Sequence, residues 1–160
     1  MSIILDTGQD IREYFMSKAE QIELDFKTAL KEKQVLKLSL LRMLKSALKN
    51  EEIAKKQATL SDEEVIAVLR RELKKRQDSI IAFEAAARND LAAQEKAEAE
   101  IIDAYLPALM SEADISKIVS AIIASGVNNF GQVMKEVMLQ SKGQADGQIV
   151  QKLVKAQLGL

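Results

Sequence analysis

The sequence is poor in the side chains that most often carry catalysis. It contains no cysteine and no histidine, which removes the thiolate nucleophile, the commonest general base and the commonest metal ligand. Glu95, Glu98 and Asp103 could offer oxygen ligands to a metal, but a solvated acidic helix face explains these carboxylates more simply. No hydroxyl group has an evident activating base, and no glycine-rich phosphate loop is present. We therefore expect no catalytic residues, no cofactor and no metal, and leave open whether the chain is an enzyme.

Basic residues offer a better lead than the nucleophiles. Arg42, Lys45 and Lys49 recur at spacings of three and four, so they share one face of a predicted helix. The next predicted helix adds further cations, namely Arg70, Arg71, Lys74, Lys75 and Arg76. Such residues can neutralise phosphates, which favours nucleic-acid binding. The alternative is an ordinary solvated face, partly paired with neighbouring glutamates, and aromatic residues that could stack on bases are missing between the cations.

The segment 142–147 is the most unusual stretch. Gly143 and Gly147 flank Asp146 between two amphipathic patterns. In the simpler interpretation, Gly143 stops one helix and Asp146 caps the next. In the functional interpretation, the N-terminus of the second helix and the nearby Lys142 bind a phosphate.

The elements that must position these residues are all predicted to be helices. Residues 9–106 contain no glycine, and apolar residues repeat at three and four rather than at two. The pattern predicts helices over 9–31 (with a break near Ser17), 35–56, 62–88 and 91–106, the last ended by Pro107. Arg76 and Gln77 interrupt the apolar stripe of the third helix. Asn89 and Asp90 either cap the fourth helix or form a short turn.

The pattern changes after Pro107. Three shorter helices are predicted, beginning near Ser111, Phe130 and Asp146, and the first of them ends at Gly126. The sequence therefore predicts an all-α protein with an N-terminal long-helix domain over 1–107 and a compact C-terminal three-helix domain over 108–160. Residues 1–15 are a candidate extension with no assigned function.

Charge is distributed unevenly, although the net charge is −1. Residues 31–76 hold 13 basic and 7 acidic groups, whereas residues 77–116 hold 2 basic and 9 acidic groups. No apolar run is long enough to span a membrane, so no membrane partner is expected. The N-terminus lacks the pattern of a signal peptide, and Asp6, Asp10 and Glu13 argue against a transit peptide. These features predict a cytoplasmic protein.

Several separated motifs resemble the GatB/YqeY family. Residues 129–138 and 142–147, with Val154, are similar to the tail domain that also closes the B subunit of tRNA-dependent amidotransferases. Residues 41–45, 75–76, 88–91 and 105–107, with intervening residues such as Phe83, Glu95 and Glu98, resemble the free-standing YqeY-like members. The resemblance covers residues 16–160. It departs at Gln144, where members often have an arginine.

The resemblance implies an all-helical fold in two parts and an association with glutamine-dependent amidation of mischarged tRNA. The tail domain is similar to a module that grips the tRNA body, and the domains that perform the carbon–nitrogen ligase chemistry are absent here. The expected function is that of an accessory tRNA-binding protein in translation. Its candidate C-terminal contacts are Lys135, Lys142, Gly143, Lys152 and Lys155. The alternative is a helical module that docks on an aminoacyl-tRNA synthetase or amidotransferase subunit through the acidic region. The oligomeric state is not predicted.

Overall fold

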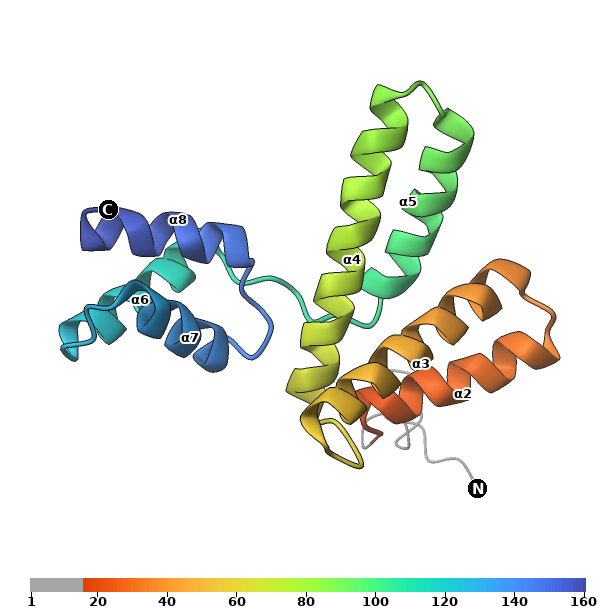
Figure 1. Ribbon diagram of the computed structural model, residues 1–160, viewed down its shortest axis with the longest axis horizontal. Coiled ribbons are helices and arrows are strands. Elements are labelled where there is room, and N and C mark those ends of the chain that lie inside the picture. Colours follow the sequence, from red (N-terminus) through yellow and green to blue (C-terminus); the bar gives the residue numbers. More distant parts are fainter. Residues whose placement is uncertain (1–15) are drawn as a thin grey trace, which may run out of the picture. The chain divides into compact units, whose positions relative to one another are not determined.

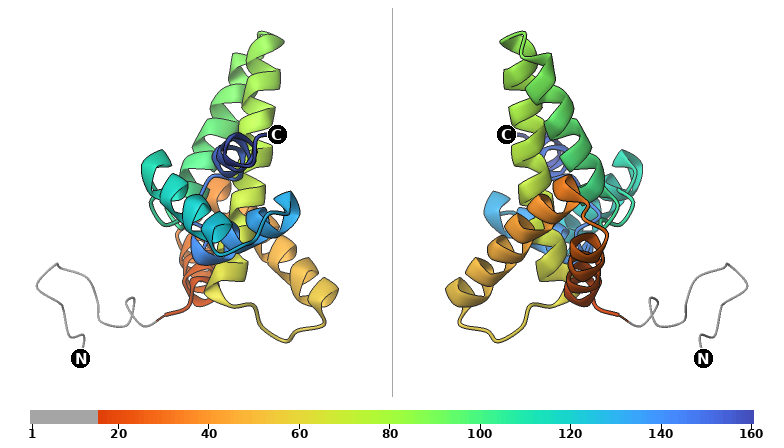
Figure 2. Two further views of the ribbon diagram at one scale, coloured as in Figure 1. Left: turned by 90° about the vertical axis from the view of Figure 1, so that its left-hand side faces the viewer. Right: turned by 90° about the vertical axis from the view of Figure 1, so that its right-hand side faces the viewer.

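The computed structural model describes residues 16–160, and this part of the chain is all-α, as predicted. Its helices are α2 (Lys18–Lys31), α3 (Val35–Lys55), α4 (Asp62–Ala85), α5 (Asn89–Asp103), α6 (Glu112–Ala124), α7 (Phe130–Gln140) and α8 (Gly147–Leu158). Figures 1 and 2 show them from three sides. The part of the predicted first helix over residues 9–15 lies outside the described residues. None of the described helices is long and apolar enough to cross a membrane.

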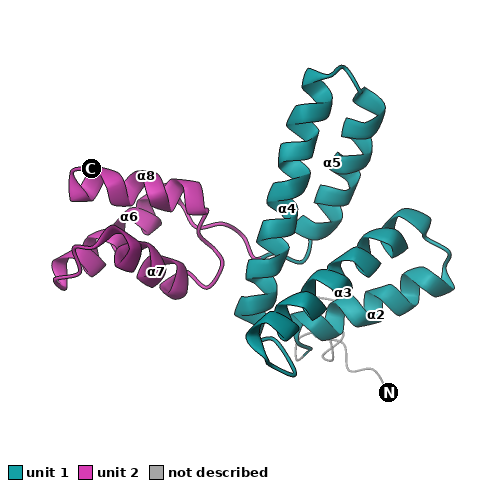
Figure 3. Ribbon diagram, in the orientation of Figure 1, with its two compact units in different colours: residues 1–106 teal, residues 107–160 magenta. Residues whose placement is uncertain are grey.

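The chain divides into two compact units (Figure 3). Unit 1 ends at Leu106 and contains α2 to α5, and unit 2 covers Pro107–Leu160 and contains α6 to α8. Each unit has a hydrophobic core of its own. The division falls at the proline, whose ring cannot continue a helix.

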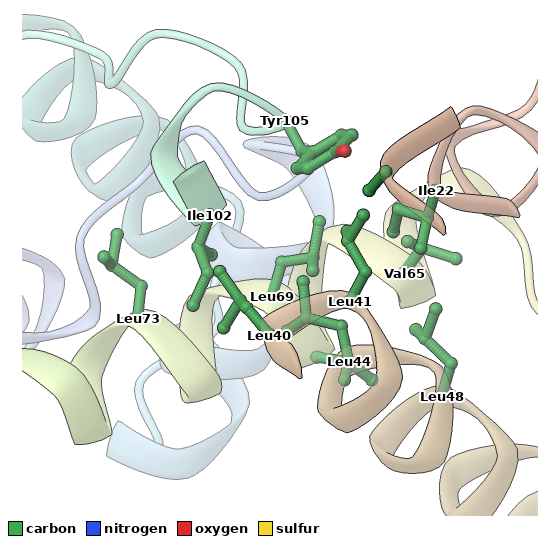
Figure 4. Packing of buried hydrophobic residues seen from close by; sticks show 12 residues of the cluster. Ile22, Leu40, Leu41, Leu44, Leu48, Val65, Leu69, Leu73, Ile102 and Tyr105 are labelled. Carbon is green, nitrogen blue, oxygen red and sulfur yellow. The ribbon is translucent and has the colours of Figure 1, made fainter. Parts of the chain in front are cut away.

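Unit 1 consists of two helical hairpins that cross. Helix α2 pairs with α3, and α4 pairs with α5, while α3 also contacts both helices of the second hairpin (Figure 1). The core lies at the crossing, where Leu40, Leu41 and Leu44 of α3 meet Leu69 of α4 and Ile102 of α5 (Figure 4). Burial of these aliphatic side chains holds the hairpins together, because each contributes about 1.5–3 kcal/mol when fully removed from water.

Unit 2 is a three-helix arrangement in which each helix packs against the other two. Val119 of α6, Val133 and Val137 of α7, and Val150 and Val154 of α8 are fully buried between them. The predicted end of the first of these helices is confirmed, since α6 is followed by Gly126 in the left-handed region at φ 99°.

Side-chain caps explain where most helices begin. Ser17 and Ser61 each form a full capping box, with Glu20 and Glu64 respectively, so the predicted box at Ser61 is confirmed. Three further helices begin after Ser111, Asn129 and Asp146, whose side chains accept hydrogen bonds from backbone N–H groups of the first turn. Helices α3 and α5 are different: they begin at Val35 and Asn89, after Gln34 and Arg88, without a side-chain cap.

Helix ends in unit 1 were predicted less well, because the chain ends helices there without glycine. Lys33, Lys56 and Ala87 follow α2, α3 and α4 in the left-handed conformation, at φ 57°, 56° and 55°. Around Ala87, the N–H of Arg88 donates to the carbonyl of Phe83 and the N–H of Ala87 donates to that of Glu84. This pair of bonds is the Schellman motif, usually built on glycine. The prediction that the third helix reaches Arg88 is therefore wrong, and the fourth helix spans Asn89–Asp103 rather than 91–106.

Candidate nucleic-acid interface

The basic stripe predicted on α3 does not form one open surface. Lys45 turns toward α2, where its Nζ lies 2.6 Å from the carboxylate of Glu23 and 4.2 Å from the ring centroid of Phe26. The hydrogen bond from Lys45 holds the pKa of the Glu23 carboxyl below its usual value. Lys45 therefore joins α2 to α3 and is already neutralised.

The two neighbours of Lys45 in the stripe differ from each other. Lys49 lies 2.8 Å from Glu52, one turn further along the same helix. Arg42 is exposed and forms no ion pair with any residue in the described range 16–160. Of the three predicted contacts on α3, Arg42 is thus the one whose charge is uncompensated.

Most of the cations predicted on α4 are compensated as well. Arg71 lies 2.5 Å from Glu51 of α3, Lys74 lies 2.8 Å from Asp78, and Lys75 lies 2.6 Å from Glu72. Arg70 is half-buried. The solvated-face alternative therefore describes α4 better than a phosphate-binding face does.

Helix α7 and the connection after it carry the clearest cluster of uncompensated cations. Lys135 and Leu139 lie four residues apart on α7, Lys142 follows the end of the helix at Gln140, and all three are exposed. Neither Lys135 nor Lys142 forms an ion pair within the described part of the chain. On α8, Lys152 lies 3.1 Å from Glu112, whereas Lys155 is exposed and has no carboxylate within salt-bridge distance among the described residues.

The segment 142–147 takes the simpler of its two predicted forms. The Asp146 carboxylate accepts hydrogen bonds from the N–H groups of Gln148 and Ile149 at 2.8 and 3.2 Å. These are groups that a phosphate at the start of α8 would use, and Asp146 already caps them, which favours the simpler interpretation. Lys142 and Gly143 are both left-handed, at φ 47° and 77°, and the segment is a helix–helix connection that leaves Lys142 exposed.

The interruption of the apolar stripe at Arg76 has an explanation that the sequence did not provide. The guanidinium of Arg76 lies 3.1 Å from Glu95 and 3.2 Å from Glu98, both on α5, and it also contacts the sulfur of Met43. All three charged side chains are largely buried. Glu95 and Glu98 are therefore neither a solvated acidic face nor available metal ligands. Among the described residues, no group of acidic side chains is arranged to hold a metal.

A second polar contact in unit 1 involves a hydroxyl group. The sequence offered no evident base that could activate such a group. The buried Tyr105 hydroxyl donates a hydrogen bond to Asp25, whose carboxylate also lies 3.6 Å from Lys37. Burial, and then the adjacent carboxylate, raise the pKa of Tyr105 far above its usual value. The phenol therefore holds its proton more tightly than an ordinary tyrosine, and it borders an open cavity of about 770 Å³ between α2, α3 and α5.

A comparison with protein-family models now places the chain. The model described as Yqey-like protein matches residues 19–158, which covers both units. The chain belongs to the Yqey-like protein family. This confirms the YqeY part of the resemblance noted in the sequence.

Three fungal relatives of this Yqey-like protein carry the name Altered inheritance of mitochondria protein 41, mitochondrial. The relative from Saccharomyces cerevisiae is 33% identical over 119 residues, which cover 71% of this chain and 64% of the relative. The relative from Pyrenophora tritici-repentis is 26% identical over 145 residues, covering 87% and 80%. The relative from Candida glabrata is 37% identical over 86 residues, covering 53% and 47%. The chain thus spans less than two thirds of the length of the yeast relative that it matches.

These relatives overturn the predicted location. The sequence was interpreted as that of a cytoplasmic protein, but the similar proteins are named as mitochondrial, so that prediction is wrong. It rested on the first residues of the chain, where Asp6, Asp10 and Glu13 argued against a transit peptide. Those residues lie outside the described part of the structure. The pattern of charges in them is not sufficient to assign the compartment of a protein.

Proposed function

We propose that this Yqey-like protein is an accessory tRNA-binding factor whose main contact is the exposed surface of α7 and of the connection that follows it. The observation that carries the proposal is the pair Lys135, on α7, and Lys142, just after the end of α7, both exposed and free of carboxylate partners among the described residues. An uncompensated lysine gains more from a phosphate than a paired one, because no existing ion pair must be broken and a condensed counterion is released.

The surroundings of α7 support the same proposal. Lys155 adds an uncompensated cation on α8, which packs against α7 in unit 2. Unit 2 as a whole carries five lysines and four carboxylates, so its attraction to RNA depends on the placement of these cations rather than on net charge. Arg42 supplies a candidate contact in unit 1. The resemblance also implies an association with tRNA-dependent amidotransferases. We include this association in the proposal and assign no ligase step to this chain.

The test is a titration of the purified protein with a tRNA mixture over a range of salt concentrations. We expect binding that is strongest near about 50 mM salt and that weakens steeply above it. The double variant Lys135→Glu and Lys142→Glu should abolish this binding. The matched control is Lys117→Glu, a lysine of the same unit that already pairs with Asp114 at 3.1 Å and should matter little. Absence of binding by the unchanged protein at about 50 mM salt would falsify the proposal.

A second candidate is docking to a protein such as an aminoacyl-tRNA synthetase or an amidotransferase subunit. The observation that favours it is the exposure of Met138 and Leu139, at 38% and 68%, beside the two lysines. Exposed Met and Leu side chains contribute to protein interfaces and gain nothing from a phosphate backbone. Leu139→Ser should therefore weaken a protein complex and leave tRNA affinity unchanged, whereas the double charge reversal should mainly affect tRNA.

A further inference from the structure

The connection between α2 and α3 presents an unusual surface in unit 1. We call residues 27–37 the α2–α3 tip; it is the end of this hairpin away from the crossing with α4 (Figure 1). In the tip, the N–H of Gln34 donates to the carbonyl of Ala29 at 3.0 Å and that of Lys33 donates to the carbonyl of Leu30 at 3.4 Å. The backbone of the tip is therefore a hydrogen-bonded turn.

Three aliphatic side chains of the tip are exposed to solvent. Leu30 is 51% exposed, Val35 is 79% exposed and Leu36 is 37% exposed. Val35 is the most exposed large apolar residue in the described chain. Single exposed apolar residues are ordinary on protein surfaces, but three at one turn form a patch of the kind that marks an interaction site.

The charges around this patch are mostly positive. The tip contains four lysines (Lys27, Lys31, Lys33 and Lys37) and a single carboxylate, Glu32. Lys27 and Lys37 lie 3.6 Å from Glu23 and Asp25 of α2. Lys31 and Lys33 form no ion pair with any residue from 16 to 160, and Glu32 accepts a hydrogen bond from the Gln34 amide. The exposed apolar residues of the tip are thus interspersed with lysines along the chain, two of them uncompensated.

We propose that the α2–α3 tip docks on an anionic phospholipid surface. Exposed aliphatic side chains enter the boundary between headgroups and acyl chains, while lysines around them attract the negative headgroups and keep their own charges in water. The contact is peripheral, with the hairpin lying at the surface and no helix crossing the membrane. It is not the membrane span that the sequence excluded, but it departs from the expectation that the protein has no membrane partner.

The chemistry of the tip favours lipid over RNA. An RNA interface would use the lysines but leave Leu30, Val35 and Leu36 without a role, because bases stack on aromatic or guanidinium groups. The tip has neither an aromatic residue nor an arginine. An anionic lipid surface is the partner that uses the aliphatic side chains and the lysines together.

A single-tryptophan reporter tests this proposal directly, because the chain contains no tryptophan. Val35→Trp places the reporter in the patch, and Ile81→Trp places a matched reporter at a residue of α4 that is 64% exposed. Vesicles of phosphatidylcholine with about 30% phosphatidylglycerol should shift the emission of the Val35 variant to shorter wavelength. The Ile81 variant should not shift, and vesicles of phosphatidylcholine alone should shift neither variant.

Flotation with the same vesicles then measures which residues matter. Lys31→Gln and Lys33→Gln should each weaken binding about fivefold, and added salt should weaken it further. Val35→Ser should weaken it about tenfold, whereas Ile81→Ser should leave it unchanged. The proposal is overturned if the unchanged protein prefers anionic vesicles no more than neutral ones, or if Val35→Ser binds as tightly as the unchanged protein. Two other outcomes also overturn it, in both of which the tip variants still bind vesicles. In the first the tip variants no longer bind tRNA, and in the second they no longer form a concentration-dependent dimer.

Discussion

Arg76 of α4 lies 3.1 Å from a carboxylate oxygen of Glu95, a residue of α5 that is 19 positions further along the chain. A second carboxylate, that of Glu98, lies 3.2 Å from the same guanidinium nitrogen. The three side chains are 10% to 19% exposed. The polar interruption in the apolar stripe of α4 is therefore an ionic joint between the two helices of this hairpin.

Removal of the cation from this joint should destabilise unit 1 strongly. Arg76→Ala leaves Glu95 and Glu98 facing each other in a largely buried position, and loss of one partner of a buried ion pair costs about 3 kcal/mol or more. Urea unfolding followed by circular dichroism measures the change in the free energy of unfolding. The triple variant Arg76→Met, Glu95→Gln and Glu98→Gln should recover much of the loss, because no unpaired charge remains.

The matched control for this joint is an exposed pair at the end of the same hairpin. Arg88 and Asp90 lie 3.3 Å apart, with side chains 56% and 67% exposed. Arg88→Ala should leave the unfolding midpoint almost unchanged, since exposed ion pairs contribute little. An equal loss in both variants would mean that burial does not decide the value of the Arg76 pairs.

The helices could be predicted from the sequence because their signals are local. Apolar spacing located every described helix, and Ser61, Ser111, Gly126 and Asp146 marked their ends through contacts within one turn. The pairing of charges could not be predicted in this way. Lys45 with Glu23, and Arg71 with Glu51, join residues of different helices, and such contacts depend on how the helices are rotated and aligned when they pack. Pairs within one helix, such as Lys74 with Asp78, follow from the spacing, but these contacts between helices do not.

The helix ends of unit 1 show a second limit of local signals, and they lead to a stability prediction. Ala87 occupies a left-handed position at φ 55°, which costs an ordinary residue about 1–2 kcal/mol relative to the right-handed region. Ala87→Gly should therefore raise the free energy of unfolding by about 0.5–1 kcal/mol, after subtraction of the greater freedom of glycine in the unfolded chain. Thermal unfolding measures this increase in the free energy of unfolding.

A glycine within α4 provides the control. Ala82 is exposed and lies in the helical part of α4, so Ala82→Gly should lower the free energy of unfolding by about 1 kcal/mol. If Ala87→Gly destabilises the protein as much as Ala82→Gly does, the left-handed turn after α4 carries no strain and the explanation of this helix end is wrong.

Tyr105 should make the stability of unit 1 depend on pH at the alkaline end. Its pKa is raised in the folded chain, whereas an unfolded tyrosine ionises near pH 10.0. Above that pH the unfolded state loses a proton that the folded state keeps, so the free energy of unfolding falls as pH rises, by at most about 1.4 kcal/mol per pH unit. Below it, both states hold the proton and Tyr105 adds no pH dependence.

Denaturant unfolding between about pH 8 and 11 measures this slope. Tyr105→Phe should flatten it, and at neutral pH should cost about 1 kcal/mol for the lost hydrogen bond to Asp25. An unchanged slope in Tyr105→Phe would show that other groups, such as lysines, cause the alkaline loss of stability.

Arg42 and Lys45 allow a final prediction that separates an open cation from a paired one. If α3 contributes to tRNA binding, Arg42→Gln should reduce the slope of the logarithm of affinity against the logarithm of salt by about 0.7–0.9, because one phosphate contact is lost. Lys45→Gln should leave this slope unchanged, since its charge is already held by Glu23 at 2.6 Å. Lys45→Gln should instead lower the melting temperature, because it removes both the pairing with Glu23 and the contact with Phe26. A change of the slope in both variants would mean that tRNA displaces Glu23 from Lys45. The whole basic stripe predicted from the sequence, rather than Arg42 alone, would then contact the phosphates.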